Sequence, residues 1–443
     1  MFNVLIVGLG QTGMSIGRYC ARSQQRAAAW EPEMAAEPST FKKAFPQMTL
    51  WQGAKLPDEA FDIPMWVLSP GVPLEHHEIE KAQRRGIIVT GDVTLFAQQN
   101  TKPILAVTGS NGKSTVVSLL EKMVAAQGLK PALLGNIGTP VLDGLAEDYD
   151  YVILELSSFQ LDITEGLAPE VACVLNVTPD HLDRHHTLEA YADSKRRIYI
   201  GAAHAVCNLE DPTTYPDTPD RMYFSMKSQD PAIWHYDAKA GELCFGKKRY
   251  NVRFLPIHSE IHYANVLAAL AMIHEAGFDT DKAFDAACTF TGLPHRLVLV
   301  AEANGIKWFD DSKATNVGAT LASIDSVSKL ITGRIVILLG GLGKGASFEC
   351  LQGPLKEHGR AAILIGEAQM QLESELKDSV TCIRATTFEE AVVLAHQEAQ
   401  AGDAVLLAPA CASWDMFKNY GERGDLFTRL AREITSLCTQ TKE

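Results

Sequence analysis

The sequence predicts an α/β fold with three domains, and three observations support this prediction. Short apolar segments alternate with stretches of helical periodicity along the chain, a pattern typical of parallel sheets covered by helices. Glycine-rich turns join a predicted strand to a predicted helix at residues 8–13 and 109–115. The length of 443 residues corresponds to roughly three domains of about 150 residues each.

The first glycine-rich turn is Gly-Leu-Gly-Gln-Thr-Gly at residues 8–13, between a predicted strand at 4–7 and a predicted helix at about 14–23. A second strand near residues 27–30 places Glu31 where a ribose-binding acid would lie. Alone, this pattern suggests a nicotinamide or flavin cofactor. The same turn can hold any diphosphate, or it can be a purely structural tight turn. Because a separate phosphate loop follows downstream, a diphosphate is the favoured ligand.

The second glycine-rich turn ends in Gly-Lys-Ser-Thr at residues 112–115, after a predicted strand at 104–107 and before a predicted helix at 116–126. Its glycines allow backbone N–H groups to converge on phosphates, and the helix N-terminus adds its dipole. Lys113 can reach the terminal phosphates, and Ser114 or Thr115 can bind Mg²⁺. The spacing departs from the general P-loop, which has a glycine where this chain has Val107. The alternative is an ordinary strand–turn–helix with a solvated lysine.

The remaining strands complete three predicted domains. In the second domain they are expected at residues 151–154, 171–176 and 205–208, with a helix at 263–276 and peripheral strands within 212–254. In the third domain they are expected at residues 306–309, 335–339, 361–365 and 404–408. The predicted domains are a Rossmann-like domain at 1–91, a central P-loop ATPase domain at 92–292 and a Rossmann-like domain at 293–443.

Composition excludes several classes of function. A formal net charge of −14 argues against non-specific nucleic-acid binding, which needs a basic surface. The sequence has no apolar run near the ~18 residues that a membrane span requires. The nine cysteines are scattered and never spaced as Cys-x-x-Cys, which favours reduced thiols and a cytoplasmic protein.

Polar residues follow several of the predicted strands, at the edge where parallel sheets bind ligands. Glu155 follows the strand at 151–154 and can hold Mg²⁺ opposite the phosphate loop. The run at 176–185 contains Asn, Asp, Arg and His residues, and is either a second phosphate or metal edge or an Asp-rich turn that caps a helix. In the third domain, Arg296 and Lys313 are candidate stabilisers of phosphoryl charge, or else a solvated pair.

Two further segments of the third domain follow predicted strands. The glycine-rich run at 340–345 could cradle an anion with its backbone N–H groups, and residues 409–417 follow the last predicted strand. So many polar or glycine-rich strand ends are difficult to explain by packing, and they favour a ligand site.

Together these motifs resemble the ATP-dependent Mur ligases of peptidoglycan synthesis, and among them the branch that adds D-glutamate. The resemblance runs nearly end to end, and the residues that carry it are 8–13, 68–73, 108–115, 135–138, 155–161, 175–185, 293–296, 311–316, 340–344 and 408–424. Narrowing to the D-glutamate branch depends on residues 155–161 and 411–424. The sequence departs from many relatives at Leu342, where they have a polar residue, and from some at Pro32, which follows Glu31.

The resemblance implies a reaction and its ligands. ATP phosphorylates the alanine carboxylate of UDP-N-acetylmuramoyl-L-alanine, and the amine of D-glutamate attacks the resulting acyl phosphate. A tetrahedral intermediate then collapses to the amide, ADP and phosphate. These small molecules are the implied partners of a chain that we expect to be monomeric.

The resemblance also implies roles for individual residues. Lys113 and Arg296 stabilise the transferring phosphoryl group. Two Mg²⁺ ions are implied, one held by Ser114 and Glu155 and the second with help from His181. Lys195 corresponds to a lysine that is carbamylated in the family, which would turn a cation into an anionic oxygen ligand. From the residues alone, Lys195 could equally be a surface lysine on a basic helix.

The implied contacts fall into four sets. The catalytic set is Lys113, Glu155, His181, Lys195 and Arg296, and the metal ligands are Ser114, Glu155, His181 and carbamylated Lys195. The ATP set is Gly109, Ser110, Asn111, Gly112, Lys113, Ser114, Thr115, Asn265, Arg296 and Asp311. The UDP-substrate set is Gln11, Thr12, Glu31, Ser69, Gly71, Asn136, Gln160 and His181. The D-glutamate set is Lys313, Thr315, Lys344, Ser413 and Tyr420.

Three alternatives remain open. Another Mur-type ligase, or one that adds glutamate to folate, would share the mechanism, although the Asp-Asn-Pro-Arg motif of the diaminopimelate- or lysine-adding branch is absent. An NAD-dependent oxidoreductase would explain residues 8–13 but would leave the phosphate loop, Glu155 and Lys195 without a role. A non-catalytic nucleotide-binding module would not need metal-type residues at so many strand ends.

Overall fold

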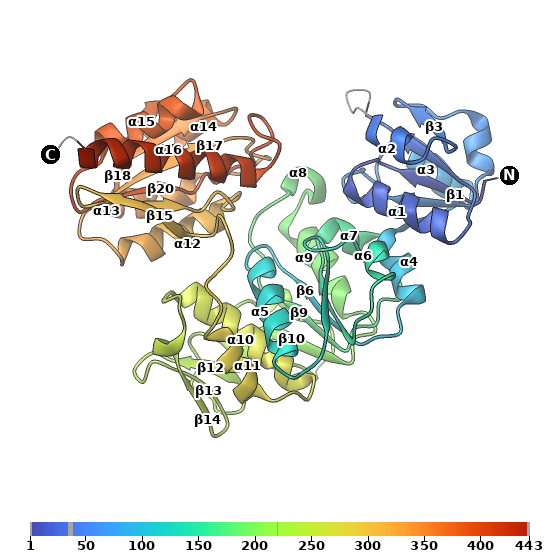
Figure 1. Ribbon diagram of the computed structural model, residues 1–443, viewed down its shortest axis with the longest axis horizontal. Helices are drawn as coiled ribbons and strands as arrows, with labels where there is room; N and C mark the ends of the chain where they lie inside the picture. The colour runs from blue at the N-terminus through green and yellow to red at the C-terminus, as the bar shows by residue number, and fades with distance from the viewer. Residues whose placement is uncertain (1, 34–38, 219, 441–443) are drawn as a thin grey trace. The chain divides into compact units, whose positions relative to one another are not determined.

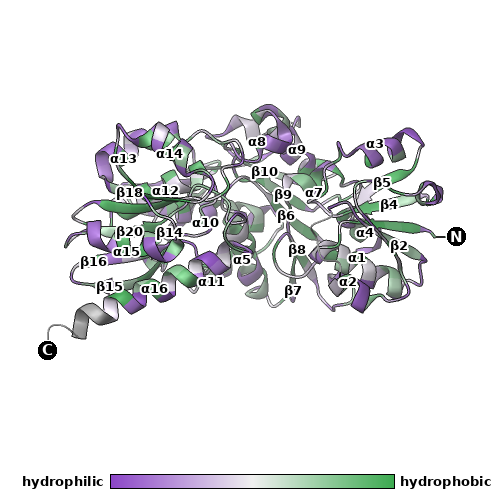
Figure 2. Cartoon of the chain, turned by 90° about the horizontal axis from the view of Figure 1, so that it is seen from above, coloured by the Kyte–Doolittle hydropathy of each residue, from purple (hydrophilic) through white to green (hydrophobic). Residues whose placement is uncertain are grey.

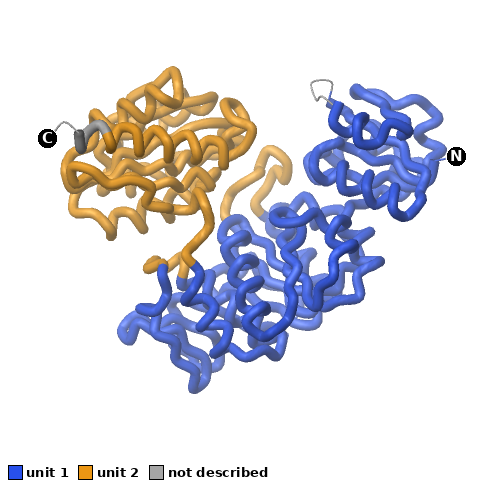
Figure 3. Tube along the Cα trace, in the orientation of Figure 1, with its two compact units in different colours: residues 1–177, 189–256, 263–290 blue, residues 178–188, 257–262, 291–443 orange. Residues whose placement is uncertain are grey.

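The computed structural model describes residues 2–33, 39–218 and 220–440, and it confirms the α/β prediction. The described strands form three sheets, with five, nine and six strands. Figure 1 shows helices packed on each sheet. The chain divides into two compact units (Figure 3). The first contains residues 1–177, 189–256 and 263–290, and the second contains residues 178–188, 257–262 and 291–443. The predicted domain boundaries after residues 91 and 292 stay predictions.

The N-terminal sheet has the order β3-β2-β1-β4-β5, and its neighbouring strands are parallel. Its strands are β1 (Val4–Val7), β2 (Ala27–Glu31), β3 (Thr49–Gln52), β4 (Met65–Leu68) and β5 (Ile88–Gly91), and its helices are α1 (Gln11–Arg22), α2 (Ser39–Ala44) and α3 (His77–Arg84). Helix α1 begins three residues before the predicted start, so it includes Gly13. A Cβ atom at Gly13 would lie 2.1 Å from the carbonyl oxygen of Gly8, and only glycine permits this approach.

The central sheet has the order β14-β13-β12-β11-β10-β9-β6-β8-β7 and is parallel from β7 to β12. Its parallel strands are β6 (Ile104–Thr108), β7 (Pro131–Gly135), β8 (Tyr151–Glu155), β9 (Val171–Val174), β10 (His204–Asn208), β11 (Met222–Ser225) and β12 (Trp234–Asp237). Strands β13 (Glu242–Phe245) and β14 (Lys248–Asn251) continue it as antiparallel strands. The prediction of peripheral strands within residues 212–254 is therefore confirmed.

The helices of this part of the chain are α4 (Asp92–Gln99), α5 (Lys113–Ala125), α6 (Val141–Gly144), α7 (Ser158–Asp162), α8 (Leu182–His185), α9 (Leu188–Arg196), α10 (Glu260–Glu275) and α11 (Thr280–Ala287). Helix α5 begins at Lys113, three residues before the predicted start, because the phosphate-loop glycines lead directly into it.

The C-terminal sheet has the order β15-β16-β20-β17-β18-β19. Its strands are β15 (Val298–Ala303), β16 (Ile306–Asp310), β17 (Ile335–Gly340), β18 (Gly359–Ile365), β19 (Thr381–Arg384) and β20 (Ala404–Leu407). All neighbouring pairs are parallel except β15 and β16. The helices are α12 (Val317–Ser328), α13 (Gln352–His358), α14 (Gln369–Leu376), α15 (Phe388–Glu398) and α16 (Tyr420–Gln440).

Hydrophobic burial explains why the strands with the strongest apolar runs form the sheet interiors. Strands β1, β6, β8, β9, β17 and β20 are buried along their whole length. Figure 2 shows most sheet strands in the colour of hydrophobic residues, whereas the helices carry both hydrophilic and hydrophobic residues. A parallel strand covered by helices on both faces is expected to have this near-continuous apolar sequence. Within the described residues, none of the helices is both long and apolar enough to cross a membrane.

A buried carboxyl group begins helix α4. Burial raises the pKa of Asp92 to about 6, although the carboxylate accepts a hydrogen bond from the N–H of Val93 at 3.0 Å. Because this pKa is higher in the folded than in the unfolded protein, the free energy of unfolding is larger at low pH. That extra stability is lost as pH rises through about 6.

We therefore predict that Asp92→Asn stabilises the protein at pH 7.5 by about 2–3 kcal/mol, the value of a shift of about two pKa units. Urea unfolding of both proteins at pH 7.5 and pH 4 is the measurement, and the difference should nearly vanish at pH 4. A stabilisation of equal size at both pH values would contradict the role of the buried charge.

Candidate active site

The phosphate loop lies between β6 and α5 and has the backbone shape that its glycines predict. Gly109 and Gly112 have positive φ angles of 152° and 86°, a region that side chains disfavour. Gly112 is also the N-cap of α5, and a Cβ atom there would lie 2.6 Å from Oδ1 of Asn265. Asn265, predicted to contact the adenine nucleotide, therefore lies next to the loop. The arrangement presents the N-terminus of a thirteen-residue helix to an anion.

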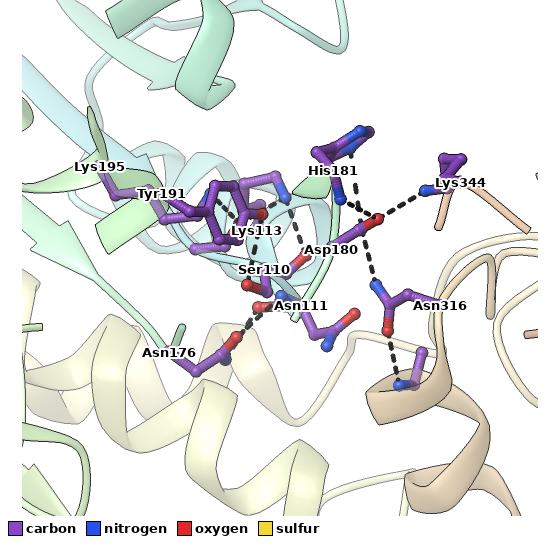
Figure 4. Close-up of polar contacts among 12 residues, drawn as sticks. Ser110, Asn111, Lys113, Asn176, Asp180, His181, Tyr191, Lys195, Asn316 and Lys344 are labelled. Carbon is purple, nitrogen blue, oxygen red and sulfur yellow. Dashed lines mark hydrogen bonds and ion pairs between the residues drawn. The ribbon is translucent and has the colours of Figure 1, made fainter. Parts of the chain in front are cut away.

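Two predicted catalytic lysines donate hydrogen bonds to the same carbonyl oxygen of this loop (Figure 4). Lys113 Nζ donates to the carbonyl oxygens of Gly109 at 2.6 Å and Ser110 at 3.0 Å. Lys195 Nζ donates to the same Gly109 oxygen at 2.9 Å, and it lies 4.3 Å from the centre of the Tyr191 ring. Lys195 is only 1% exposed, so it is not the surface lysine that the residues alone allowed. An anion would compete with the loop carbonyls for these ammonium groups.

Glu155 ends β8 beside β6, where it is paired in register with Val107. The residue is 1% exposed. Its Oε1 accepts a hydrogen bond from Asn136 Nδ2 at 2.8 Å, whereas its buried Oε2 has no hydrogen-bond partner among the described residues. A buried carboxylate oxygen without a partner is costly unless a ligand binds it.

The oxygen ligands that Glu155 and Ser114 offer fit Mg²⁺ better than they fit a metal ion that is held by protein side chains alone. Across the described ranges, no group of three or more His, Cys, Asp or Glu residues could hold a metal ion. Mg²⁺ is commonly bound through one or two carboxylates, together with water and substrate phosphates. The free Oε2 of Glu155 and the buried Ser114 at the start of α5 match that pattern.

Asn176 is a positioning residue of the loop that the sequence did not single out. Its Oδ1 accepts a hydrogen bond from the Asn111 N–H at 2.8 Å, and its Nδ2 donates to the Asn111 carbonyl at 3.1 Å. The Ser110 N–H also donates to the Asn176 carbonyl at 2.9 Å. Strand β9 was expected to reach residue 176 but ends at Val174, because Asn176 hydrogen-bonds to the loop (Figure 4).

We predict that Asn176→Ala raises the KM for ATP about 30-fold, since it removes two hydrogen bonds worth about 1 kcal/mol each. The backbone bond from Ser110 remains, so the fold should be retained. Initial rates at varied ATP measure the effect, and Asn251→Ala in the peripheral strand β14 is the control. An unchanged KM for ATP in Asn176→Ala would show that the side chain does not shape the loop.

The N-terminal glycine turn has its own polar support. The N–H of Leu9 donates to Glu31 Oε2 at 2.9 Å, and Ser69 Oγ donates to the Gly8 carbonyl at 2.8 Å. Both side chains are buried. In this structure Glu31 therefore holds the turn itself, while Gln11 and Thr12 lie in the first turn of α1. A Cβ atom at Gly71 would meet no heavy atom within 4 Å.

Gln160, predicted to lie near the muramoyl arm, has a structural role at the start of α7. Its Oε1 accepts from the Ser157 N–H at 3.0 Å, and its own backbone N–H donates to Ser157 Oγ at 3.2 Å, which together form a capping box. This contact was visible in the sequence as a serine followed three residues later by glutamine. The structure thus uses the side-chain carbonyl of Gln160 to fix the loop that follows Glu155.

In the second compact unit, the side chains of Lys344, Asn316 and His181 lie around Asp180 (Figure 4). Lys344 Nζ lies 2.6 Å from Asp180 Oδ1, and Asn316 Nδ2 donates to Asp180 Oδ2 at 3.0 Å. Burial would raise the pKa of Asp180, but Lys344 and the other contacts outweigh burial and lower it. Next to it, His181 has a φ of 55° and is the N-cap of α8. Lys344, predicted to bind D-glutamate, is thus already next to an acidic group.

Asp311 and Lys313, two more predicted residues of this unit, follow the end of β16. Lys313 Nζ lies 4.1 Å from the centre of the Tyr420 ring, so two residues predicted for D-glutamate are in contact. Asp311 accepts a hydrogen bond from Ser323 Oγ. Burial raises the pKa of Asp311 to about 6, against the opposing effects of Ser323 and Arg296. Arg296 thus acts on the charge of Asp311, and the predicted contacts of both residues with ATP stay predictions.

Comparison with protein-family models divides the chain into three matches. Residues 2–91 match the Mur ligase MurD-like N-terminal domain. Residues 107–273 match the Mur ligase middle domain. Residues 295–411 match the Mur ligase glutamate ligase domain.

Full-length relatives agree with these matches. The UDP-N-acetylmuramoylalanine--D-glutamate ligase of Legionella pneumophila strain Lens is 41% identical over 97% of this chain and 99% of the relative. The protein of the same name from Pseudomonas fluorescens strain Pf-5 is 40% identical over 97% of this chain and 98% of the relative.

Among solved structures, UDP-N-acetylmuramate-alanine ligase from Thermotoga maritima superposes with a TM-score of 0.61 at 16% identity and covers all of both chains. A pseudomurein peptide ligase type C from Methanothermus fervidus gives a TM-score of 0.63 at 14% identity, over 98% of this chain and all of the other. At these identities the structures support the fold alone, but the relatives at about 40% identity also settle the family. The chain belongs to the Mur ligase family.

Proposed function

We propose that this chain is the ATP-dependent ligase that adds D-glutamate to UDP-N-acetylmuramoyl-L-alanine in the synthesis of peptidoglycan precursors. The observation that carries this proposal is near-full-length identity of about 40% with ligases named for that reaction. The geometry agrees, because a phosphate loop with Lys113 lies beside a strand that ends in the buried carboxylate Glu155. The enzyme is a carbon–nitrogen ligase that uses ATP.

The chemistry requires activation because a carboxylate is a poor electrophile. In the proposed reaction, a carboxylate oxygen of the alanine residue attacks the γ-phosphorus of ATP, and ADP leaves. The neutral amine of D-glutamate then attacks the acyl carbon, and the amine loses a proton as the tetrahedral intermediate collapses and phosphate leaves. Positioning and charge neutralisation are the main tasks of the protein. Lys113 and Arg296 are proposed to neutralise the phosphoryl oxygens.

We propose two Mg²⁺ ions, which would lower the charge of the phosphate oxygens. Ser114 and Glu155 would hold one ion, as the free Oε2 of Glu155 supports. His181 and the carbamate of Lys195 would hold the second. Burial of Lys195 at 1% exposure supports a special role for this amine, since a buried ammonium is costly.

Carbamylation has a direct test. Protein equilibrated with ¹³C-bicarbonate should give a carbamate signal in its ¹³C spectrum, and that signal should be absent from Lys195→Arg. The same signal in both proteins would place the modification elsewhere, and the lack of a signal in the wild type would contradict carbamylation. Carbamylation joins the neutral amine of Lys195 to one CO₂ and releases one proton.

The substrate contacts remain proposals of the same kind. Gln11, Thr12, Glu31, Ser69, Gly71, Asn136, Gln160 and His181 are proposed for the UDP substrate, and Lys313, Thr315, Lys344, Ser413 and Tyr420 for D-glutamate. The contact between Lys313 and Tyr420 supports the second set. The scattered, unpaired cysteines of the described chain favour a cytoplasmic location, and a monomer is the simplest state for a chain that holds all of these residues.

The test is product formation with a panel of amino acids. Purified protein with ATP, Mg²⁺ and UDP-N-acetylmuramoyl-L-alanine is incubated separately with D-glutamate, L-glutamate, L-alanine or meso-diaminopimelate. Mass spectrometry should find the amide product with D-glutamate alone. A product with another amino acid would keep the chemistry and change the specificity, and no product with any would contradict the proposed function.

A further inference from the structure

Arg423 is a buried cation that none of the predicted contacts includes. It lies in the first turn of α16 and is 1% exposed. Burial lowers the pKa of its guanidinium to about 10. The N-terminus of a helix also disfavours positive charge. An arginine in such a place is costly, so its contacts need an explanation.

The guanidinium of Arg423 binds neutral oxygens only. Its Nε donates to Ser312 Oγ at 3.0 Å, and one terminal nitrogen donates to the Ser312 carbonyl at 2.8 Å. Both terminal nitrogens lie 3.3 Å from the Cys411 carbonyl. Within the described part of the chain, no carboxylate lies within 4 Å of this guanidinium.

The acidic groups that act on this charge are held by other partners. Asp415 and Asp310 both raise the pKa of Arg423, but neither forms an ion pair with it in the described chain. Asp415 Oδ2 accepts a backbone N–H at 3.0 Å. Asp310 Oδ2 lies 2.6 Å from His295 Nδ1, and its Oδ1 accepts from the Ser312 N–H at 2.9 Å. The positive charge of Arg423 is therefore only partly balanced.

Arg423 directly links two segments that lie next to residues proposed for D-glutamate, and a third segment is linked through Ala412. Ser312 directly precedes Lys313, and its Oγ also donates to the Tyr420 carbonyl at 2.8 Å. Cys411 lies two residues before Ser413. The next residue, Ala412, exchanges two backbone hydrogen bonds with Leu342, which lies two residues before Lys344. One rigid guanidinium thus fixes the spacing of these segments.

We infer that Arg423 is a positioning residue for the amino-acid substrate, which holds the Ser312 and Cys411 segments in place and adds positive charge at a site for a dicarboxylic amino acid. This inference rests on the proposed function. Lysine keeps the charge but lacks the planar fork, whereas glutamine loses the charge and most donors. The two variants therefore separate charge from geometry.

The experiment measures KM separately for D-glutamate, ATP and UDP-N-acetylmuramoyl-L-alanine. In Arg423→Gln, we expect the KM for D-glutamate to rise about 10-fold or more, as for the loss of charge-assisted hydrogen bonds. The other two KM values should change by less than about 2-fold, in keeping with a local effect. Arg423→Lys should recover part of the affinity. Arg429→Gln removes an exposed charge from the same helix and should behave as the wild type.

A milder variant keeps the inference testable if Arg423→Gln does not fold. Ser312→Ala removes only the hydroxyl that binds Arg423 and Tyr420, and it should also raise the KM for D-glutamate selectively. An unchanged KM for D-glutamate, or an equal rise in all three KM values, would overturn the inference. A wild type that makes no product with D-glutamate would instead overturn the proposed function, and the inference with it.

Discussion

Replacement of Lys113 by alanine should abolish most of the ligase activity while leaving the protein folded. We propose that this ammonium group supplies the positive charge of the phosphate loop to the transferring phosphoryl group. On that proposal kcat is expected to fall by at least about 100-fold, the usual effect of removing one stabiliser of transition-state charge. The fold should survive because Lys195 Nζ still donates to the Gly109 carbonyl after Lys113 is removed. Phosphate release dependent on D-glutamate is the measurement.

Lys122→Ala is the matched control for this prediction. Lys122 is exposed on the same helix α5 and carries the same charge. Its removal should leave both kcat and the KM for ATP unchanged. If Lys113→Ala retained activity within a few-fold of the wild type, then the loop would not be the site of phosphoryl transfer.

Replacement of Glu155 by glutamine should separate metal binding from folding. The glutamine side chain can still accept the hydrogen bond from Asn136, but it offers an amide nitrogen where the free Oε2 now lies. Mg²⁺ prefers anionic oxygen, so activity should fall at least about 100-fold. Half-maximal activity should also require more Mg²⁺ than in the wild type.

The shift in Tm caused by Mg²⁺ and ATP is a second measurement of metal binding in the Glu155→Gln variant. A ligand that binds only the folded state raises Tm, so Mg²⁺ and ATP together should raise the Tm of the wild type. That rise should be much smaller in the variant, while the Tm without ligands stays near the wild-type value. Glu165→Gln, an exposed change in the same part of the chain, should keep the full rise. A full ligand-induced rise in Glu155→Gln would contradict metal binding by this carboxylate.

The strands with the clearest signal in the sequence are those that are buried along their whole length. Strands β6, β8, β17 and β20 are buried at every residue, and their apolar runs were readable in the sequence. Strands β15 and β19 were not predicted because their residues are half-buried or exposed, so no apolar run marks them. They lie at the two edges of the C-terminal sheet.

Site residues were predictable where their contacts are local in the sequence, and were not predictable where their contacts are distant. The phosphate loop and the end of β8 were predictable because strand, turn and helix are adjacent in the sequence. Asp180 binds Lys344 across 164 residues, and Arg423 binds Ser312 across 111 residues. No local pattern marks such pairs. The polar run at 176–185 indicated a functional segment, but it could not show that Asn176 would hold the loop or that Asp180 would hold a lysine.

The central claim is that ATP activates the alanine carboxylate and that D-glutamate completes the reaction. The most direct measurement uses UDP-N-acetylmuramoyl-L-alanine with ¹⁸O in its terminal carboxylate, together with ATP, Mg²⁺ and D-glutamate. If the carboxylate attacks the γ-phosphorus, one ¹⁸O atom passes into each phosphate released, and labelled phosphate should form only when D-glutamate is present. Unlabelled phosphate, or labelled phosphate formed equally well with other amino acids, would contradict the account.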